Sequence, residues 1–159
     1  MNKNIILNSS LEVSLRILIL LRNFSDEQLD IDDILLLDYY ILHLNDFDIK
    51  LNSIHPSMPN RENEIFVRRE SIQQGILLLE SRDLIDTNFT PQGITYSSNK
   101  FTLLFTDYLE SSYASRLKRN IETSIDKNKR EIISKVKETL FNNINLWSTN
   151  YDTFYTKED

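Results

Sequence analysis

At 159 residues, the chain is long enough for one domain that buries a core of its own. It has no Cys, which excludes disulfides and thiolate metal sites, and its net charge of −6 argues against a freestanding DNA-binding protein, which needs a basic excess. Its longest purely aliphatic run, Ile17–Leu21, is far shorter than the roughly 20 residues that span a bilayer. The apolar patch at the N-terminus is too short for a secretory signal, so we expect a cytoplasmic protein without membrane contact.

The first third of the chain predicts two helices. Ser9 and Glu12 have the spacing of a capping box, and the apolar run that follows predicts a largely buried helix ending at about Arg22. A second helix is expected over residues 31–44. The acidic residues at positions 30–33 favour capping over calcium binding, because the turn glycine and the distal Glu of a calcium loop are missing.

A third helix followed by a β-hairpin is the most specific fold-level pattern in the chain. The helix is expected over residues 64–83, and Gly75 in its middle predicts close packing against a neighbouring helix. The turn residues TPQG at 90–93 lie between the β-prone pieces at 84–85 and 94–96. A helix followed by such a hairpin is typical of the third helix and wing of a winged helix-turn-helix.

The rest of the chain predicts further helices. One is expected over residues 99–109, with apolar side chains at Phe101, Leu104, Phe105 and Tyr108. A long helix from Ser112 toward Trp147 has an apolar stripe, which either packs back on the core or is offered to a partner helix. We therefore predict a mainly α fold with a small β-hairpin wing, divided into a winged helix-turn-helix-like domain over 1–110, a C-terminal helical extension over 111–147 and a polar tail over 148–159.

The inventory of reactive side chains argues against an enzyme. The two histidines lie far apart, there is no Cys, and no Ser lies in a nucleophile-elbow sequence. Two glycines in total cannot build a phosphate-binding loop, and no Asp/Glu cluster joins a His at metal-binding spacing. We expect no catalytic residues, no cofactor and no metal.

The stretch NSIHPSMPNRENEIFVRRE, residues 52–70, joins the second helix to the third. Its prolines keep the loop extended, and a pre-ordered loop loses little entropy on docking. Nothing orients His55 or supplies a nucleophile, so an active site is not expected here. Arg68 and Arg69 point about 100° apart on a helix, so one of them is expected to pair internally, with Glu64 or Glu70 as its mate. Two alternatives stay open, a surface that binds a partner and a connector pinned to the third helix.

Several segments together resemble the middle component of ABC-three-component systems, which are bacterial antiphage conflict loci that include the Lamassu type. The segments are LNSSLEVSLRILILL, LDYYILHLNDF, SIHPSMPNRENEIFVRRE with SIQQGILLLESRDLI, and GITYSSNKFTLLFTDYLESSYASRL. The resemblance extends from about Leu7 to Leu117. Its specificity lies in the order of the segments rather than in any one of them.

The resemblance implies a small non-enzymatic subunit that bridges an SMC- or Rad50-like coiled-coil ATPase and an effector, often a nuclease. DNA would be contacted only within the complex, and self-association is left open. The family offers no catalytic residues. The candidate partner-binding residues, taken by their position in the matching loop and helix, are His55, Pro56, Pro59, Arg61, Arg68, Arg69 and Glu70.

The alternative function is a winged-helix transcriptional regulator that binds DNA. Arg68, Arg69, Gln73 and Gln74 are residue types that read base edges or hold phosphates. Against this function, residues 88–92 of the expected wing contain no Lys or Arg. Salt-dependent binding of duplex DNA by the purified chain would favour the regulator.

Overall fold

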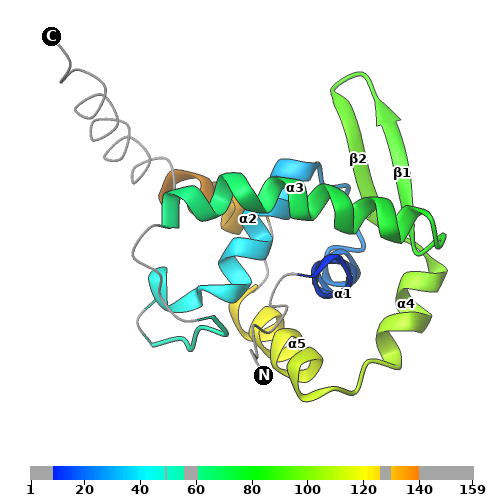
Figure 1. Cartoon of the computed structure of the whole chain (residues 1–159). Helices are drawn as coiled ribbons and strands as arrows, with labels where there is room; N and C mark the ends of the chain where they lie inside the picture. Colours follow the sequence, from blue (N-terminus) through cyan, green and yellow to red (C-terminus); the bar gives the residue numbers. More distant parts are fainter. Residues whose placement is uncertain (1–8, 49, 56–60, 126–129, 140–159) are drawn as a thin grey trace, which may run out of the picture.

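The computed structural model describes residues 9–48, 50–55, 61–125 and 130–139 (Figure 1). In this part of the chain the elements are, in order, α1 (Ser10–Asn23), α2 (Ile31–Leu42), the 3-10 helix η1 (Leu44–Asp46), α3 (Arg61–Glu80), β1 (Ile85–Thr90), β2 (Gly93–Ser98), α4 (Lys100–Asp107) and α5 (Ser112–Ser124). Residues 130–139 are helical as well. The fold is mainly helical with a small two-stranded antiparallel sheet, as predicted.

Capping side chains set the starts of α1 and α2 where the sequence predicts them. The Ser9 side chain accepts a hydrogen bond from the backbone N–H of Glu12 (3.2 Å), and the Asp30 side chain accepts one from the N–H of Asp33 (2.8 Å). Each contact satisfies one of the free amides at a helix start. Helix α2 ends at Leu42, slightly before the predicted end, because the next residue has left helical backbone angles.

Helix α1 lies at the centre of the molecule, and Figure 1 shows it nearly end-on between the other helices. Its residues from Ile17 to Leu21 are at most 1% exposed, which confirms the predicted buried helix. Where a helix is buried on all sides, as α1 is over these residues, its polar side chains need hydrogen-bond partners inside the protein.

Gly75 allows α3 to pack closely on α1. A Cβ atom at this position would lie 3.0 Å from side-chain carbons of Val13 and Ile17. The Ser14 hydroxyl donates a hydrogen bond to the Gly75 carbonyl (3.1 Å), so the two backbones are joined as well as packed. The predicted reason for a glycine inside this helix is confirmed.

The β-hairpin stands out from the helices at one end of α3 (Figure 1). Thr90 pairs with Gly93 at its turn, and Gly93 has a φ of 136°, a conformation that suits glycine. Midway along β2, the backbone N–H and carbonyl of Tyr96 exchange hydrogen bonds with Leu29 (2.8 and 3.0 Å). The hairpin is therefore tied to the connection between α1 and α2.

The described residues that follow α4, 112–125 and 130–139, pack on the core. Leu117 and Ile121 of α5, together with Ile133 and Val136, are buried in one cluster with residues of α1 and α2. The described part of the apolar stripe thus packs on the core, which is the first of the two alternatives.

A continuous helix from Ser112 toward Trp147 is not confirmed. Helix α5 ends at Ser124, and Ile125 has the non-helical angles φ −102° and ψ 75°. The Ser124 hydroxyl donates to the carbonyl of Asn120, while the Ser124 carbonyl accepts from the Tyr40 hydroxyl (3.4 Å). These side-chain bonds compete with continuation of the helix. Residues 140–147 of the expected helix and the tail at 148–159 lie outside the described residues.

Candidate protein-binding surface

Arg68, one of the candidate partner-binding residues, is a buried member of an ion cluster with Arg16 and Asp38. Its guanidinium donates from Nη1 to Oδ2 of Asp38 (2.9 Å), and Arg16 donates from Nε to Oδ1 of the same carboxylate (2.6 Å). Arg68 is 4% exposed, Arg16 1% and Asp38 0%. The cluster joins α1, α2 and α3 at one point, so Arg68 contributes to the position of α3, and its side chain has little exposed surface.

The two guanidiniums of this cluster hold the Asp38 carboxyl in its ionised form. Burial alone would raise the pKa of Asp38, but the adjacent guanidiniums of Arg16 and Arg68 outweigh it and hold the pKa below its usual value. Glu12, which accepts from Nη1 of Arg16 (3.2 Å), supplies a second carboxylate at the edge of the cluster. Because each charge is matched, removal of one would leave the others buried without compensation.

His55 is attached to the end of α2. Its backbone N–H donates to the carbonyl of Leu42 (3.1 Å), and its ring packs edge-on against His43, with 6.1 Å between the ring centroids. Burial, followed by the positive charges of Arg16 and Arg68, lowers the pKa of His55. The neutral form of the imidazole is therefore favoured, and the His55 backbone and ring both contact the end of α2.

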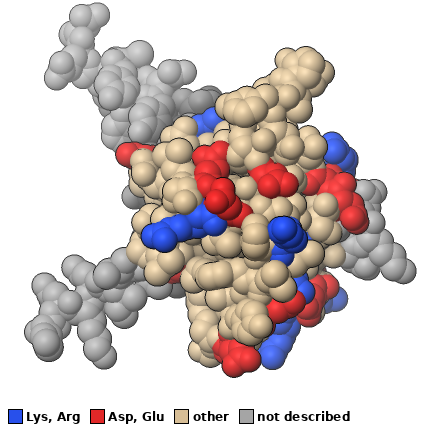
Figure 2. Space-filling view, turned by 90° about the vertical axis from the view of Figure 1, so that its right-hand side faces the viewer, with Lys and Arg blue, Asp and Glu red and all other residues tan. Residues whose placement is uncertain are grey.

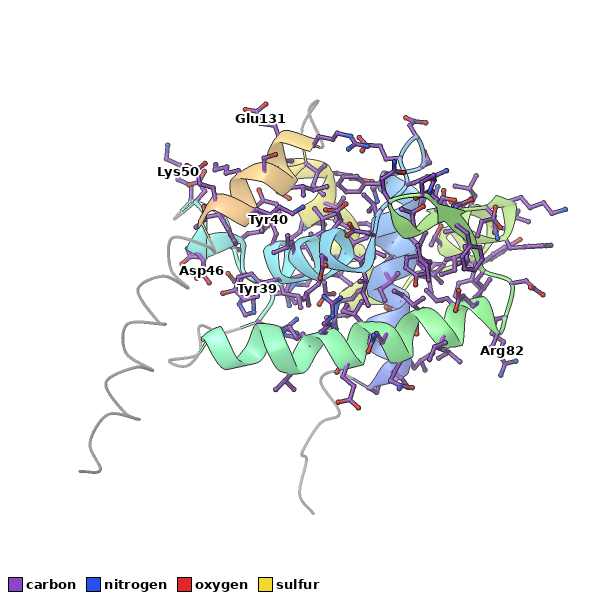
Figure 3. All side chains as sticks on the ribbon, turned by 90° about the horizontal axis from the view of Figure 1, so that it is seen from above. Tyr39, Tyr40, Asp46, Lys50, Arg82 and Glu131 are labelled. Carbon is purple, nitrogen blue, oxygen red and sulfur yellow. The ribbon has the colours of Figure 1, made fainter. Side chains whose placement is uncertain are left out.

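Aromatic and polar contacts brace the same end of α2. The Tyr39 hydroxyl donates to Oδ2 of Asp46 (3.3 Å), and Figure 3 shows both residues on the opposite side of the molecule from Arg82. The rings of Tyr39 and Tyr40 each pack against Phe47. The turn that follows α2 is thus fixed by the helix it leaves.

The remaining candidate residues divide between the surface and the part of the chain outside the described residues. Arg69 is exposed and forms an ion pair with Asp32 of α2, and Glu70 is exposed beside it. The described mates of Arg68 and Arg69 are therefore aspartates of α2 rather than Glu70. Asp38 and Asp32 reach the two arginines, although they are distant in sequence, because α2 packs directly beside α3. Pro56, Pro59 and the side chain of Arg61 lie outside the described residues, as does the side chain of Glu64.

The outward face of α3 and the outer half of the hairpin are the most exposed apolar parts of this side of the protein. Val67 is 70% exposed and Leu77 57%, while Phe89 and Ile94 are 81% and 48% exposed. Phe89 and Ile94 are direct cross-strand partners. We call these four residues the α3–hairpin surface. No Lys, Arg, Asp or Glu occurs between Asp86 and Lys100, and the projecting hairpin is uncharged in Figure 2.

A groove of about 540 Å³ lies between α3 and β2. It joins the helix part of the α3–hairpin surface to the hairpin part, since Leu77 and Ile94 are both in its wall. Its remaining wall is a mixture of apolar and amide side chains with one carboxylate: Ile31, Gln73, Gln74, Ile76, Glu80 and Tyr96. Such a mixture suits a protein segment better than a nucleic acid.

Two patterns in the sequence could have indicated the buried ion cluster and the exposed hairpin tip. Asp38 interrupts the apolar run LLLDYY, and Arg16 interrupts LRILILL. A charged residue inside such a run is exposed if its helix lies at the surface, and it is buried with a partner if its helix is central. Phe89 lies directly before the turn of a hairpin, where an aromatic side chain cannot reach the core. Neither signal identifies a partner, because the partner depends on how the helices pack.

Two kinds of site are absent from the described part of the chain. No group of three or more His, Cys, Asp or Glu side chains there could hold a metal ion. Among the described helices, none is both long and apolar enough to cross a membrane.

Comparison with known families returned one match. A family described as "ABC-three component (ABC-3C) system Middle Component 2" matches residues 6–150. No curated protein and no solved structure matches the chain.

Proposed function

We propose that this chain, which belongs to the ABC-three component (ABC-3C) system Middle Component 2 family, is a non-catalytic subunit that bridges two partners in an antiphage defence complex. Family membership makes it an accessory subunit of a multi-component system. The proposed partners are an SMC- or Rad50-like coiled-coil ATPase and an effector, often a nuclease, as in Lamassu-type systems. The chain would need no cofactor and would work in the cytoplasm.

The α3–hairpin surface is the observation that supports this function most directly. Its four apolar side chains are 48–81% exposed, two of them on α3 and two on a hairpin without charged residues between positions 87 and 98. Groups of exposed apolar residues mark surfaces that bind other proteins. An uncharged hairpin gains nothing from phosphates, because phosphate binding depends on Lys and Arg.

The candidate residues fit this surface in different ways. Glu70 lies on α3 about one turn from Val67 and provides a polar contact at its rim, while Arg69 is exposed on another side of α3, where it pairs with Asp32. Arg68 and His55 hold α3 and the preceding loop in place through the ion cluster and the end of α2. Pro56, Pro59 and Arg61 remain proposed contacts on the basis of sequence alone.

The finer description of the fold belongs to the same proposal. We take α1, α2, α3 and the hairpin as a winged helix-turn-helix in which α3 occupies the place of the recognition helix. In this arrangement the helix and wing that would face DNA in a regulator face a protein instead. A C-terminal helix reaching toward Trp147 remains part of the proposal on the basis of sequence alone.

Co-purification tests the proposed role. The chain is co-expressed with the ATPase and the effector encoded beside it, and each partner is captured through a tag on this chain. We expect Leu77→Glu and Phe89→Glu to lose at least one partner, since each places a charge in an apolar contact. Leu104→Glu is the matched control, because Leu104 is as exposed as Leu77 (57% each) but lies on α4.

Three results would contradict the proposal. They are capture of both partners by the Leu77→Glu and Phe89→Glu variants, hydrolysis of ATP or cleavage of DNA by the isolated chain, and neighbouring genes that encode no such ATPase. Tight, salt-dependent binding of duplex DNA by the isolated chain would instead favour the transcriptional regulator.

A further inference from the structure

Helix α4 has its polar side turned inward. Thr102 and Thr106 are fully buried (0% exposed), whereas Phe101, Leu104 and Tyr108 are 45%, 57% and 82% exposed. Leu103 and Phe105, on the flanks of this outward face, are 43% and 42% exposed. An ordinary surface helix has the opposite arrangement, with its apolar stripe on the core.

Specific hydrogen bonds hold α4 in this orientation. The Thr102 hydroxyl donates to the carbonyl of Leu84 and accepts from the backbone N–H of Asn99 (2.9 Å). The Thr106 hydroxyl accepts from Nη1 of Arg22 (2.6 Å). The helix cannot roll its apolar face inward without breaking these contacts, so that face needs a cover from outside the chain's described core.

The sequence of the outward face is complementary to itself when reversed. Leu104 stands at the middle, with an aromatic ring about one turn to either side, at Phe101 and Tyr108. A cation, Lys100, lies at the N-terminal end, and an anion, Asp107, lies at the C-terminal end, where its side chain is partly exposed and pairs with Arg22 of α1. Two such helices placed antiparallel bring Leu104 against Leu104, each aromatic ring against the other kind, and Lys100 of each against Asp107 of the other.

We propose that α4 is the contact between two copies of this chain, related by a two-fold axis that passes near Leu104. A two-fold interface requires one surface that matches itself, and the opposite charges at the ends of α4 meet this requirement. Antiparallel packing also places opposite ends of the two helix dipoles side by side. The inference is independent of the proposed ATPase and effector partners.

A groove next to α4 gives the second copy room to seat. It has a volume of about 400 Å³, and its wall is almost wholly apolar, with Leu11, Leu15, Leu18 and Phe105 among its lining residues. Leu11, which is 61% exposed at the start of α1, extends the apolar area beyond α4 itself. Because one short helix is a small contact, we expect a reversible dimer with a dissociation constant in the micromolar range.

Analytical ultracentrifugation of the purified full chain over a range of concentrations tests the proposal. We expect a monomer–dimer equilibrium for the wild type and a monomer at every concentration for Leu104→Glu, since that change places two carboxylates at the axis. Leu77→Glu, the equally exposed control on α3, should dimerise as the wild type does. A monomeric wild type, an unaffected Leu104→Glu, or dissociation by Leu77→Glu alone would overturn the proposal.

Charge exchange tests the antiparallel arrangement separately. Lys100→Glu and Asp107→Lys should each weaken self-association several-fold, because each creates two like-charge contacts per dimer. A mixture of the two variants should form heterodimers in which both ends are matched again. Asp107→Lys also removes the ion pair with Arg22 within the chain and places a second cation beside it. Arg22 has further bonds to Thr106 and the carbonyl of Leu103, and thermal unfolding checks that they keep α4 anchored. Failure of the mixture to associate more tightly than either variant alone would rule out the antiparallel pair.

The two proposals fail independently. If Leu104→Glu loses the ATPase or the effector while sedimenting as the wild type does, α4 binds another subunit and the dimer is wrong. If Leu104→Glu is monomeric and still captures both partners, the dimer stands and the bridging function is tested only by Leu77 and Phe89.

Discussion

Two regions of the molecule have the reverse of the usual polarity. The buried junction of α1, α2 and α3 contains charges, and the exposed outer side of α4 is apolar. At the junction, three full charges are almost completely buried, and Arg16 and Arg68 share the carboxylate of Asp38. On α4, five large apolar side chains are at least 42% exposed while two threonines are buried. The buried charges are satisfied within the chain. The exposed apolar residues of α4 are not covered by the described part of the chain. The first region therefore positions helices, and the second is the surface for which we propose a binding partner.

Neutralising Asp38 should give the largest loss of stability. Asp38→Asn keeps the shape of the side chain but leaves two buried guanidiniums with no anion between them, and we expect the unfolding free energy to fall by about 3–5 kcal/mol. Urea unfolding followed by circular dichroism measures it. Asp32→Asn, on the same helix, removes only the exposed pair with Arg69 and should cost about 1 kcal/mol or less. Equal losses for the two variants would mean that burial of the cluster is not what matters.

Thr102→Val should have an intermediate effect and tests whether the inward side of α4 holds the helix in place. The change keeps the volume but removes the hydroxyl that bonds Asn99 and Leu84, so we expect a loss of about 1–2 kcal/mol. Leu104→Glu, on the opposite face, should change the unfolding free energy of the monomer by no more than about 0.5 kcal/mol. A larger loss of unfolding free energy for Leu104→Glu than for Thr102→Val in the same assay would contradict this role of the inward side of α4.

Acid should produce the smallest effect, through His55. Because burial and the neighbouring guanidiniums lower the pKa of His55 in the folded chain, its neutral form is favoured by folding. That contribution is fully present above the usual histidine pKa of about 6.5 and is lost as the pH falls through the folded-state pKa. His55→Gln should therefore flatten the decline of the melting temperature just below that pH. An unchanged decline would show that the loop is not held by the neutral ring.

Local chemistry made part of this structure predictable. Ser9 and Asp30 cap helices because a side-chain oxygen at that position satisfies a nearby amide whatever the tertiary fold. The turn at Thr90 and Gly93 is equally local, and the lack of a Cβ at Gly75 points to close packing without naming the neighbour.

The pairing of distant residues was not predictable in this way. Arg16 and Asp38 are far apart in sequence, and only the packing of α1 on α2 brings them together. The periodicity of residues 99–109 indicated a helix and its apolar face, yet it could not show that this face points away from the core. That orientation depends on Thr102 and Thr106 finding partners in Leu84 and Arg22, which is a property of the assembled fold.

The tie between Tyr96 and Leu29 gives the hairpin a mechanical character. Strands of six residues extend roughly 20 Å, and β2 is fastened at mid-strand by the Tyr96–Leu29 bonds and by the Thr95 hydroxyl donating to the side chain of Gln28 (3.0 Å). A partner that displaced Phe89 at the tip would therefore also pull on the connection between α1 and α2.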